Sequence, residues 1–324
     1  MYKASVFEVI GKISSNRIKA ATRMVNKLRC FAFLLFAVDL LISASARSPA
    51  LSSGEPFFVG DPNATGDLTP WERIQVGKAD YKVSEHPHGL TESGSVSIAP
   101  DPLGKQGRVY KLTVTPDANF AASSAKSDRV DLWNEPKPYL GQEGQETWEH
   151  FQILFSSGGE SYKPAPGNWN WLVQHHNDPR YKSFITAGSI ERELPELAWG
   201  VDTKHSLPNG VQADHLFVVI RGGDDLHPPT ETRVPADTPL VYDQWNDMLV
   251  HVIWSHDPQK GMVEWWLNGK SLYSQHIADL WLRPDGTTDH VNFEYSNYRV
   301  HAAWISTVYF SRVKLGASRE AVAF

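Results

Sequence analysis

From Trp71 to the C-terminus, short apolar or alternating runs of residues are separated by clusters of turn-forming residues. No long stretch repeats its apolar residues at the 3.6-residue period of a helix. The clearest strands are RVYKLTV (108–114), TWEHFQILF (147–155), WNWLVQHH (169–176), DHLFVVI (214–220), DMLVHVIW (247–254), MVEWWL (262–267), VNFEYSNYRV (291–300) and STVYFSRVKL (306–315). Strands at hairpin spacing, without intervening helices, predict an all-β, antiparallel β-sandwich over residues 71–324.

One hairpin can be placed directly. The strand 262–267 is followed at once by Asn268-Gly269. This dipeptide supplies the two positive φ angles that a two-residue type I′ turn requires. We therefore expect a second strand to begin immediately after Gly269.

Residues 1–46 differ in texture from the rest. They carry seven basic and two acidic residues, and the apolar run CFAFLLFAVDLLI is followed by Ser-Ala-Ser-Ala ending at Ala46. A basic segment, an apolar segment of about a dozen residues and a small-residue site predict a secretory signal peptide. The run is short for a membrane span and contains Asp39, so an uncleaved anchor is the weaker alternative. Met24 would give a leader of more ordinary length.

Removal of this leader leaves 24 of the 31 basic residues and 35 of the 37 acidic residues, and it removes the single Cys. A net charge of −11 excludes the basic character of a nucleic-acid binder. A disulfide scaffold and multi-cysteine metal sites are also excluded. An acidic, cysteine-free chain that keeps all 12 Trp is typical of an exported, secreted or periplasmic protein that binds sugars. We expect no membrane association after cleavage, and a monomer.

Three segments outside the predicted strands have the composition of irregular structure. Residues 47–70 are rich in Pro, Gly, Ser and Thr and are predicted to form a flexible linker. Residues 156–168 and 221–245 are predicted to be long loops. Long loops in a compact domain are usually functional or disordered, and in a sandwich they could border a concave substrate groove.

Three short patterns carry polar groups suited to chemistry. Gln174 and His176 share one face of a strand, while Val173 and His175 point to the other. A solvated face with a structural histidine explains this pair equally well. Tyr298 shares a face with Ser296, and such a tyrosine is more often a packing residue. Arg129-Val130-Asp131 is a polar pair that can equally be a cross-strand ion pair of little weight.

Taken together, these patterns resemble the jelly-roll polysaccharide lyases of the heparinase I-like and glucuronan lyase group, which are related in site design to alginate lyases. The resemblance covers residues 108–316. Its stretches are GQETWEHFQILF (144–155), VQHHND (173–178), DQWNDMLVHVIWSHDP (243–258), GMVEWWLNGK (261–270), NFEYSNYR (292–299) and TVYFSRVKLG (307–316). The resemblance implies a jelly roll that cleaves a uronic-acid polysaccharide by β-elimination.

The resemblance also implies roles for individual residues. By position, Gln174 and Arg129 would bind the sugar carboxylate and stabilise the dianion formed when the C5 proton leaves. Tyr298 and His176 match the positions of the base and the acid. Substrate contacts would come from Asn177, Arg180, Arg221 and Arg299. No cofactor or catalytic metal is implied, although a structural calcium ion is compatible with the resemblance because some members of the family bind one.

The sequence departs from the family pattern at three positions. The usual Arg-x-Glu is Arg129-Val130-Asp131, the lysine common after the phenylalanine is Glu294, and the glycine before the final tyrosine is Ser296. Loss of the lysine removes a cation that would help to hold an anionic sugar.

The stereochemistry of the elimination is left open by the sequence. On glucuronate or mannuronate, one tyrosine can serve as both base and acid, because the proton and O4 leave from the same face of the ring. On iduronate or guluronate, His176 and Tyr298 would act from opposite sides. The absence of a dense Lys/Arg cluster favours an unsulfated uronan, such as glucuronan or alginate, over heparin.

Two other functions remain open. A non-catalytic, lectin-like carbohydrate-binding sandwich would share the fold and the Trp content. A glycoside hydrolase would need two closely placed carboxylates, and Asp131 and Glu135 are four residues apart with Trp133 between them. His86-Pro-His88 lacks further ligands at metal-binding spacing.

Overall fold

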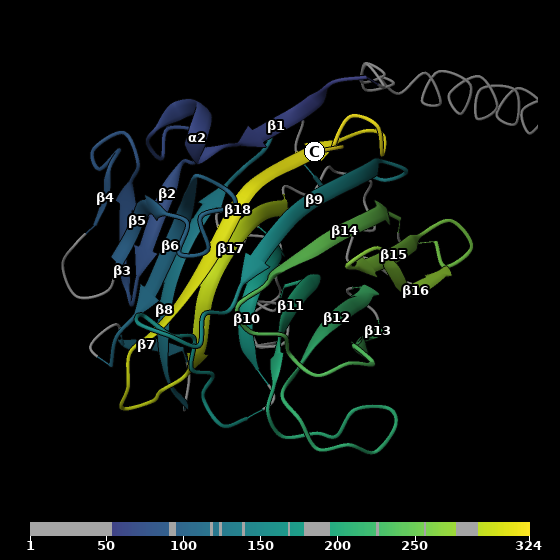
Figure 1. Cartoon of the computed structure of the whole chain (residues 1–324). Helices are drawn as coiled ribbons and strands as arrows, with labels where there is room; N and C mark the ends of the chain where they lie inside the picture. The colour runs from purple at the N-terminus through teal and green to yellow at the C-terminus, as the bar shows by residue number, and fades with distance from the viewer. Residues whose placement is uncertain are drawn as a thin grey trace, which may run out of the picture. The chain divides into compact units, whose positions relative to one another are not determined.

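The computed structural model describes residues 54–324, except for 91–94, 117–118, 123–124, 138–139, 168, 178–194, 225–226, 256 and 277–290. The chain divides into two units, residues 1–51 and 52–324, and the description concerns the second. The predicted signal peptide lies outside the described residues. Figure 1 shows that the second unit is built almost entirely of strands.

Within the described residues the strands form two antiparallel sheets of nine strands each. The first sheet contains, in order across it, β16 (Lys270–His276), β15 (Met262–Leu267), β14 (Trp245–Ile253), β9 (Glu146–Leu154), β18 (Ser306–Gly316), β6 (Arg108–Val114), β5 (Ser95–Pro100) and β4 (Gly89–Leu90), with β1 (Pro56–Gly60) paired to β18. The second sheet contains β13 (His227–Pro235), β12 (His215–Asp224), β11 (Leu197–Asp202), β10 (Asn170–Asn177), β17 (Val291–Val300), β8 (Ala125–Asn134), β2 (Arg73–Val76) and β3 (Ala79–Lys82), with β7 (Asn119–Ala122) paired to β8.

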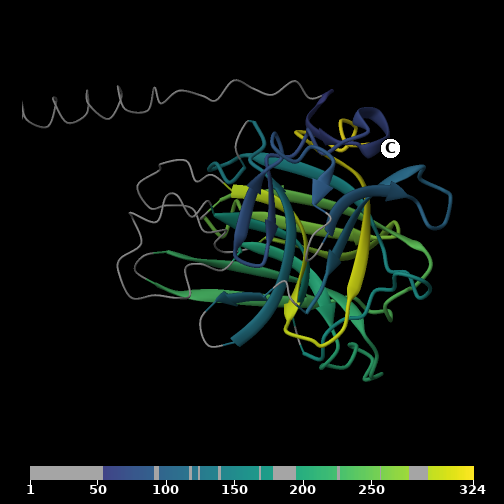
Figure 2. The same ribbon diagram turned by 90° about the vertical axis from the view of Figure 1, so that its left-hand side faces the viewer.

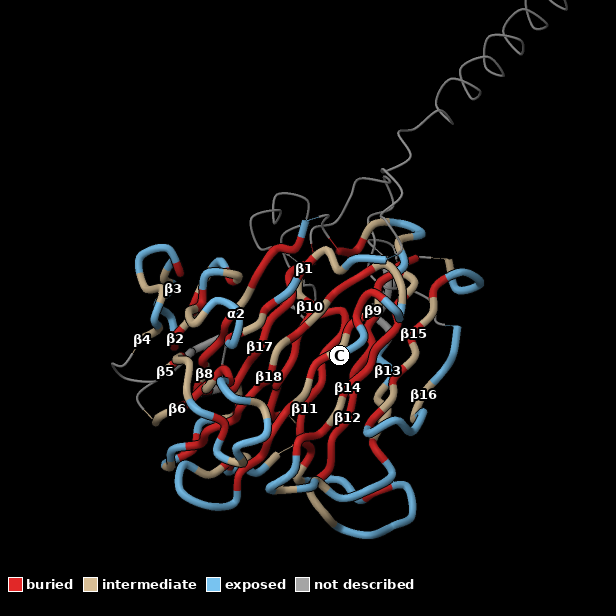
Figure 3. Tube along the Cα trace, turned by 45° about the horizontal axis from the view of Figure 1, so that its top comes forward, coloured by how far each residue is buried: buried red, intermediate tan, exposed pale blue. Residues whose placement is uncertain are grey.

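The hydrophobic core lies between the two sheets, which form the layers seen in Figures 1 and 2. The first sheet contributes Phe151 and Phe310, for example, and the second contributes Val173, Phe293 and Tyr295. Figure 3 shows buried residues running along the strands of both layers, with exposed residues mainly in the connections. The fold is therefore the predicted β-sandwich. Among the described residues, no helix has the length and apolarity that a membrane crossing requires.

The predicted hairpin is confirmed. Asn268 and Gly269 have φ angles of 52° and 77°, and β16 begins at Lys270, so that this turn joins β15 to β16. Three predicted strands, 108–114, 262–267 and 291–300, have the observed bounds of β6, β15 and β17.

Two predicted irregular segments contain regular structure. Within 47–70, predicted as a linker, β1 pairs with β18 and is followed by the short helix α2 (Pro62–Thr65). Within 221–245, predicted as a loop, β12 extends to Asp224 and β13 pairs with it. Both predictions were wrong over these residues, because a strand at the edge of a sheet tolerates the prolines that were interpreted as loop signals. Segment 156–168 contains no strand among its described residues.

Candidate functional site

Polar side chains gather on the face of the second sheet that points away from the core, which we call the outer face. β17 and β8 pair in regular register, with Tyr298 opposite Arg129, Ser296 opposite Asp131 and Glu294 opposite Trp133. On the other side of β17, Gln174 of β10 lies opposite Glu294 and His176 lies opposite Asn292. The group formed by Arg129, Asp131, Gln174, His176, Glu294, Ser296 and Tyr298 is called the polar strip below.

Arg129 is held by two carboxylates of the polar strip. Its Nε donates to Asp131 Oδ2, and its Nη2 donates to Glu294 Oε2 at 3.1 Å. The side chain of Arg129 is 12% exposed, and that of Asp131 is fully buried. The guanidinium also lies over the ring of Tyr298, 5.0 Å from its centroid. Arg129 therefore connects the tyrosine to the acidic part of the strip.

Gln174 reaches the same carboxylate from the opposite side of β17. Its Nε2 donates to Glu294 Oε2 at 3.2 Å and lies 2.9 Å from Ser296 Oγ. Gln174 is 2% exposed and Ser296 is fully buried. One oxygen of Glu294 thus accepts hydrogen bonds from an amide and from a guanidinium.

The carboxyl groups of Asp131 and Glu294 both have raised pKa values. Burial raises the pKa of Asp131, and the neighbouring Glu294 raises it further, while Arg129 acts in the opposite direction. Burial likewise raises the pKa of Glu294, against the lowering effects of Arg129 and of His175. Two buried acids share one cation, so the fully ionised strip carries excess negative charge.

Tyr298 lies on the outer face and not in the main core. It packs against a separate cluster on that face, where Trp169 meets its ring edge-on at a centroid distance of 5.2 Å. Burial raises the pKa of Tyr298, whereas Arg129 and a hydrogen bond with Ser127 lower it. The partly exposed phenol has a cation beside it that stabilises the phenolate.

His176 lies at the far end of the polar strip. Its strand partner Asn292 is six residues from Tyr298 along β17, which corresponds to roughly 20 Å of extended backbone. Gln174, Glu294 and Ser296 occupy the positions between them. The structure therefore places Tyr298 beside Arg129, with His176 beyond Gln174. It does not bring together the imidazole and the phenol that the resemblance implies as acid and base around one sugar ring.

The four predicted substrate contacts have different outcomes. Arg180 lies outside the described residues, and of Asn177 only the backbone, paired with Val291, is described. Arg221 lies on the outer face but is only 7% exposed. Its Nε donates to Glu231 at 3.0 Å, and its Nη1 donates to the carbonyl of Pro195 at 2.8 Å.

Arg299 does not fit its predicted role in substrate binding. It points into the sandwich, is 1% exposed, and is ion-paired with the fully buried Asp128 at 3.5 Å. It also donates to the carbonyls of Lys163 and Trp304. Its place in the alternation of β17, with Tyr295 and Asn297, sets this inward direction.

Aromatic residues beside the polar strip were not identified from the sequence. Trp171, Ala198, Phe217 and Val219 form a cluster on the outer face, against which Trp169 and Tyr298 pack. Trp171 pairs with Tyr298 of β17 and lies on the outer face. Simple alternation from Gln174, three residues further along β10, would instead place Trp171 on the inner face. The register shifts between Trp171 and Val173, and this irregularity turns Trp171 outward. The Trp-x-Trp spacing at 169–171 is the sequence feature that could have indicated these aromatic residues.

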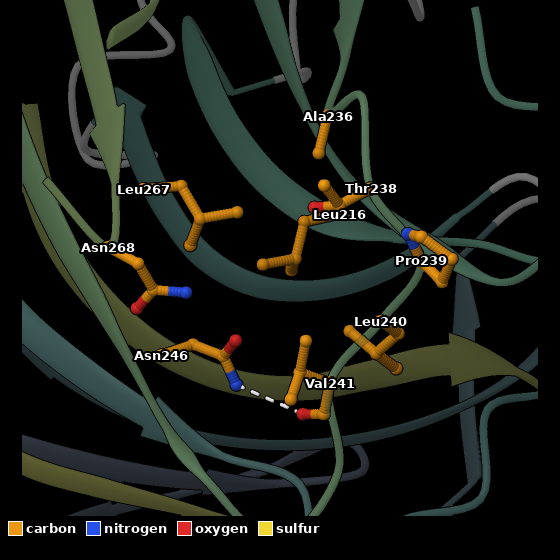
Figure 4. A pocket seen from close by; sticks show the side chains of 9 residues that line it. All are labelled: Leu216, Ala236, Thr238, Pro239, Leu240, Val241, Asn246, Leu267 and Asn268. Atoms are coloured by element: carbon orange, nitrogen blue, oxygen red, sulfur yellow. Dashed lines mark hydrogen bonds between the residues drawn. The ribbon is translucent and has the colours of Figure 1, made fainter. Parts of the chain in front are cut away.

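A small pocket elsewhere is not a candidate site. Its volume of about 10 Å³ is no more than a water molecule requires. Figure 4 shows its lining, which is Leu216, Ala236, Thr238, Pro239, Leu240, Val241, Asn246, Leu267 and Asn268. None of these side chains can act as an acid or a base. Among the described residues, no group of three or more His, Cys, Asp or Glu side chains is placed to hold a metal ion.

Comparisons with known proteins give a family and a fold. The family model described as "Polysaccharide lyase" matches residues 63–313. The endo-β-1,4-glucuronan lyase from the fungus Trichoderma reesei is similar in structure, with a TM-score of 0.58, 14% identity, and coverage of 82% of this chain and 98% of that chain. An alginate lyase from Chlorella virus matches with a TM-score of 0.46 and 12% identity, over 81% of this chain and 100% of that chain. No curated protein matches in sequence.

Proposed function

This chain belongs to the polysaccharide lyase family, since the family model covers most of it, and from that membership we propose that it cleaves an unsulfated uronan by β-elimination. In this reaction the C5 proton of a uronate is removed and the C4–O bond breaks. The product carries an unsaturated uronate at its new non-reducing end. Because the C5 proton is barely acidic beside a charged carboxylate, the enzyme must stabilise the dianion formed when that proton leaves.

The observation that carries the proposal is the convergence of Arg129 and Gln174 on one carboxylate oxygen. A guanidinium and an amide that bind a carboxylate together are the donors that a uronate needs at its C6 carboxyl group. They bind the side chain of Glu294 at 3.1 and 3.2 Å, which supports their ability to hold a carboxylate at this place.

Tyr298 is the proposed base, and it returns the proton to O4 as the acid. The guanidinium of Arg129 over its ring lowers the pKa of Tyr298 and so opposes the effect of burial, which raises that pKa by more. A positioned base and acid each contribute roughly 10²- to 10⁴-fold to the rate. The neighbouring Trp169, which is partly exposed, offers an apolar ring of the kind that packs against sugars.

The strand register favours one tyrosine acting alone. With His176 six residues further along the strip, the pair is poorly placed to act on both faces of one sugar ring. A single tyrosine suits glucuronate or mannuronate, where the proton and O4 leave from the same face. We therefore propose glucuronan as the preferred substrate, with His176 beside a neighbouring sugar position. The structural relative from Trichoderma reesei is an endo-β-1,4-glucuronan lyase, which agrees with this choice.

The charge distribution supports an unsulfated substrate. Arg129 is bound by Asp131 and Glu294, and Arg221 is bound by Glu231. Because carboxylates of the protein already balance both arginines, neither provides an additional cation for a sulfate group beyond the binding of one uronate carboxylate. We also propose that residues 1–46 direct export, which places the enzyme where extracellular polysaccharides occur.

A panel of uronans tests the proposal. Incubation with glucuronan, polymannuronate, polyguluronate and heparin is followed by the ultraviolet absorbance of the unsaturated product. We expect the fastest rise with glucuronan, and at most about a tenfold loss of rate in the variant His176→Ala. Reducing ends without absorbance would indicate a hydrolase, and neither signal would indicate a binding protein. A loss of 10²-fold or more in His176→Ala would instead favour the two-residue scheme.

A further inference from the structure

The carboxylate of Glu294 occupies the donors that the proposed reaction requires. Arg129 Nη2 and Gln174 Nε2 both contact Glu294 Oε2, at 3.1 and 3.2 Å. Glu294 is 5% exposed, so this contact is made inside the site and not at its edge. A uronate bound by the same two donors would have to replace it.

The charge balance makes this replacement costly. Arg129 already faces Asp131, which is fully buried, and Glu294. A substrate carboxylate would bring a third negative charge to a single guanidinium. Like charges within a few ångströms in a buried site repel strongly, and a group in that position gains a proton more readily than it remains ionised.

We propose that Glu294 is an internal competitor for the substrate carboxylate, and that uronate binding is accompanied by uptake of one proton by the Asp131–Glu294 pair. Once protonated, Glu294 loses its attraction for Arg129 and releases both donors. This inference rests on the proposed function and adds a pH-dependent control to it.

The surroundings of Glu294 support proton uptake. The titratable and charged groups near it on the outer face, among the described residues, are Arg129 and Asp131 on β8, His176 on β10 and Tyr298 on its own strand. His175 of β10 acts on it from the inner face of the same sheet. Burial raises the pKa of Glu294, and Arg129 and His175 offset this only in part. The pKa of Asp131 is raised for the same main reason. The pair therefore takes up a proton at a higher pH than ordinary carboxyl groups do.

The consequence for kinetics is a split between KM and kcat. Below the pKa of the pair, the donors are released and KM is low. Above it, the pair must take up one proton from the solvent for each substrate molecule that binds, so KM rises up to tenfold per pH unit. The phenol of Tyr298 works in the opposite direction, because a base is more active when deprotonated, and kcat therefore rises with pH.

The variant Glu294→Gln separates these effects. Glutamine keeps the size of the side chain and an acceptor oxygen but carries no charge. We expect KM for glucuronan at pH 8 to fall at least tenfold relative to the unaltered enzyme, and to show little pH dependence between pH 5 and 8. The matched control is Glu264→Gln on β15 of the other sheet, where the carboxylate contacts His251 and Ser274. The control should leave the pH profile unchanged.

A second measurement does not depend on the folding of the Glu294 variant. Glucuronan oligosaccharides are bound to the variant Tyr298→Phe, which keeps Arg129, Gln174 and Glu294, in calorimetry at pH 7.5 with buffers of different ionisation enthalpy. We expect uptake of about one proton per oligosaccharide bound. Binding without proton exchange would overturn the inference.

The outcomes distinguish this inference from the proposed function. An active enzyme whose KM has the same pH dependence in the unaltered and Glu294→Gln forms would overturn the competitor role alone. Absence of unsaturated product in every form, at every pH, would overturn the proposed function together with the inference.

Discussion

A buried histidine and glutamate hold the two sheets together directly behind the candidate site. His175 Nε2 lies 2.7 Å from Glu149 Oε1, and neither side chain is exposed. The ring of His175 is surrounded by Trp199, Trp254 and Phe293. In the part of the chain that the structure describes, His175 Nδ1 and Glu149 Oε2 have no hydrogen-bond partner, so each group depends on the contact with the other.

Removal of one member of this pair should cost more than an ordinary core substitution. We expect Glu149→Leu to lower the free energy of unfolding by about 3 to 5 kcal/mol, since it leaves a buried imidazole without its partner. Urea denaturation measures the change. The double variant Glu149→Leu, His175→Phe should recover part of the loss. A single variant within 1 kcal/mol of the unaltered protein would show that the pair has no such role.

At this scale, alternation predicted the directions of side chains well. Gln174 and Val173 point to opposite faces as expected, and Tyr298 shares its face with Ser296. The prediction failed for Arg299, where the charge was interpreted as a substrate contact although the alternation placed it inward with Tyr295. The contact between Glu294 and Gln174 joins residues 120 positions apart and could not be predicted from sequence alone.

Among the elements, β1 shows how an irregular composition can conceal a strand. It pairs with β18 from Pro56 to Gly60, and Phe58 packs edge-on against Trp71 at a centroid distance of 5.5 Å. Phe58 is 8% exposed. The strand therefore covers one end of the core.

The contribution of β1 can be measured through its phenylalanine. We expect Phe58→Ala to destabilise the protein by about 3 kcal/mol, because a buried aromatic ring is removed from beside Trp71. Thermal or urea unfolding checks this value. The exposed neighbour Val59 provides the control, since Val59→Ala should change stability by less than 1 kcal/mol. Equal, small effects of the two substitutions would show that this segment behaves as the linker first expected.

Strand prediction succeeded where the residue pattern was strong. Apolar alternation located β6, β15 and β17, and Asn268-Gly269 located the turn between β15 and β16. It failed for β13, whose sequence contains Pro228, Pro229 and Pro235. β13 is the last strand at one edge of its sheet, where prolines are tolerated. Pairing order, unlike composition, is set by contacts between distant segments.

For the whole molecule, the negative charge opposes the approach of a polyanion. Residues 47–324 carry a net charge of −11 by the count above. The field of such a chain extends about one Debye length, roughly 10 Å at 0.1 M salt. We expect KM for long glucuronan chains to fall when NaCl is raised from 20 to 200 mM, and KM for short oligosaccharides to change less. A KM for the long chains that rises with salt would indicate attraction dominated by local arginines.

The central claim is that the phenol of Tyr298 removes the C5 proton, and its removal is the most direct test. The initial rate of absorbance increase on glucuronan is compared for the unaltered enzyme and Tyr298→Phe at matched folded concentration. The ring of Tyr298 packs against Trp169, and phenylalanine keeps that contact, so the fold should be retained. The account predicts a loss of at least about 10²-fold in kcat. A Tyr298→Phe variant that retains near-full turnover would contradict it.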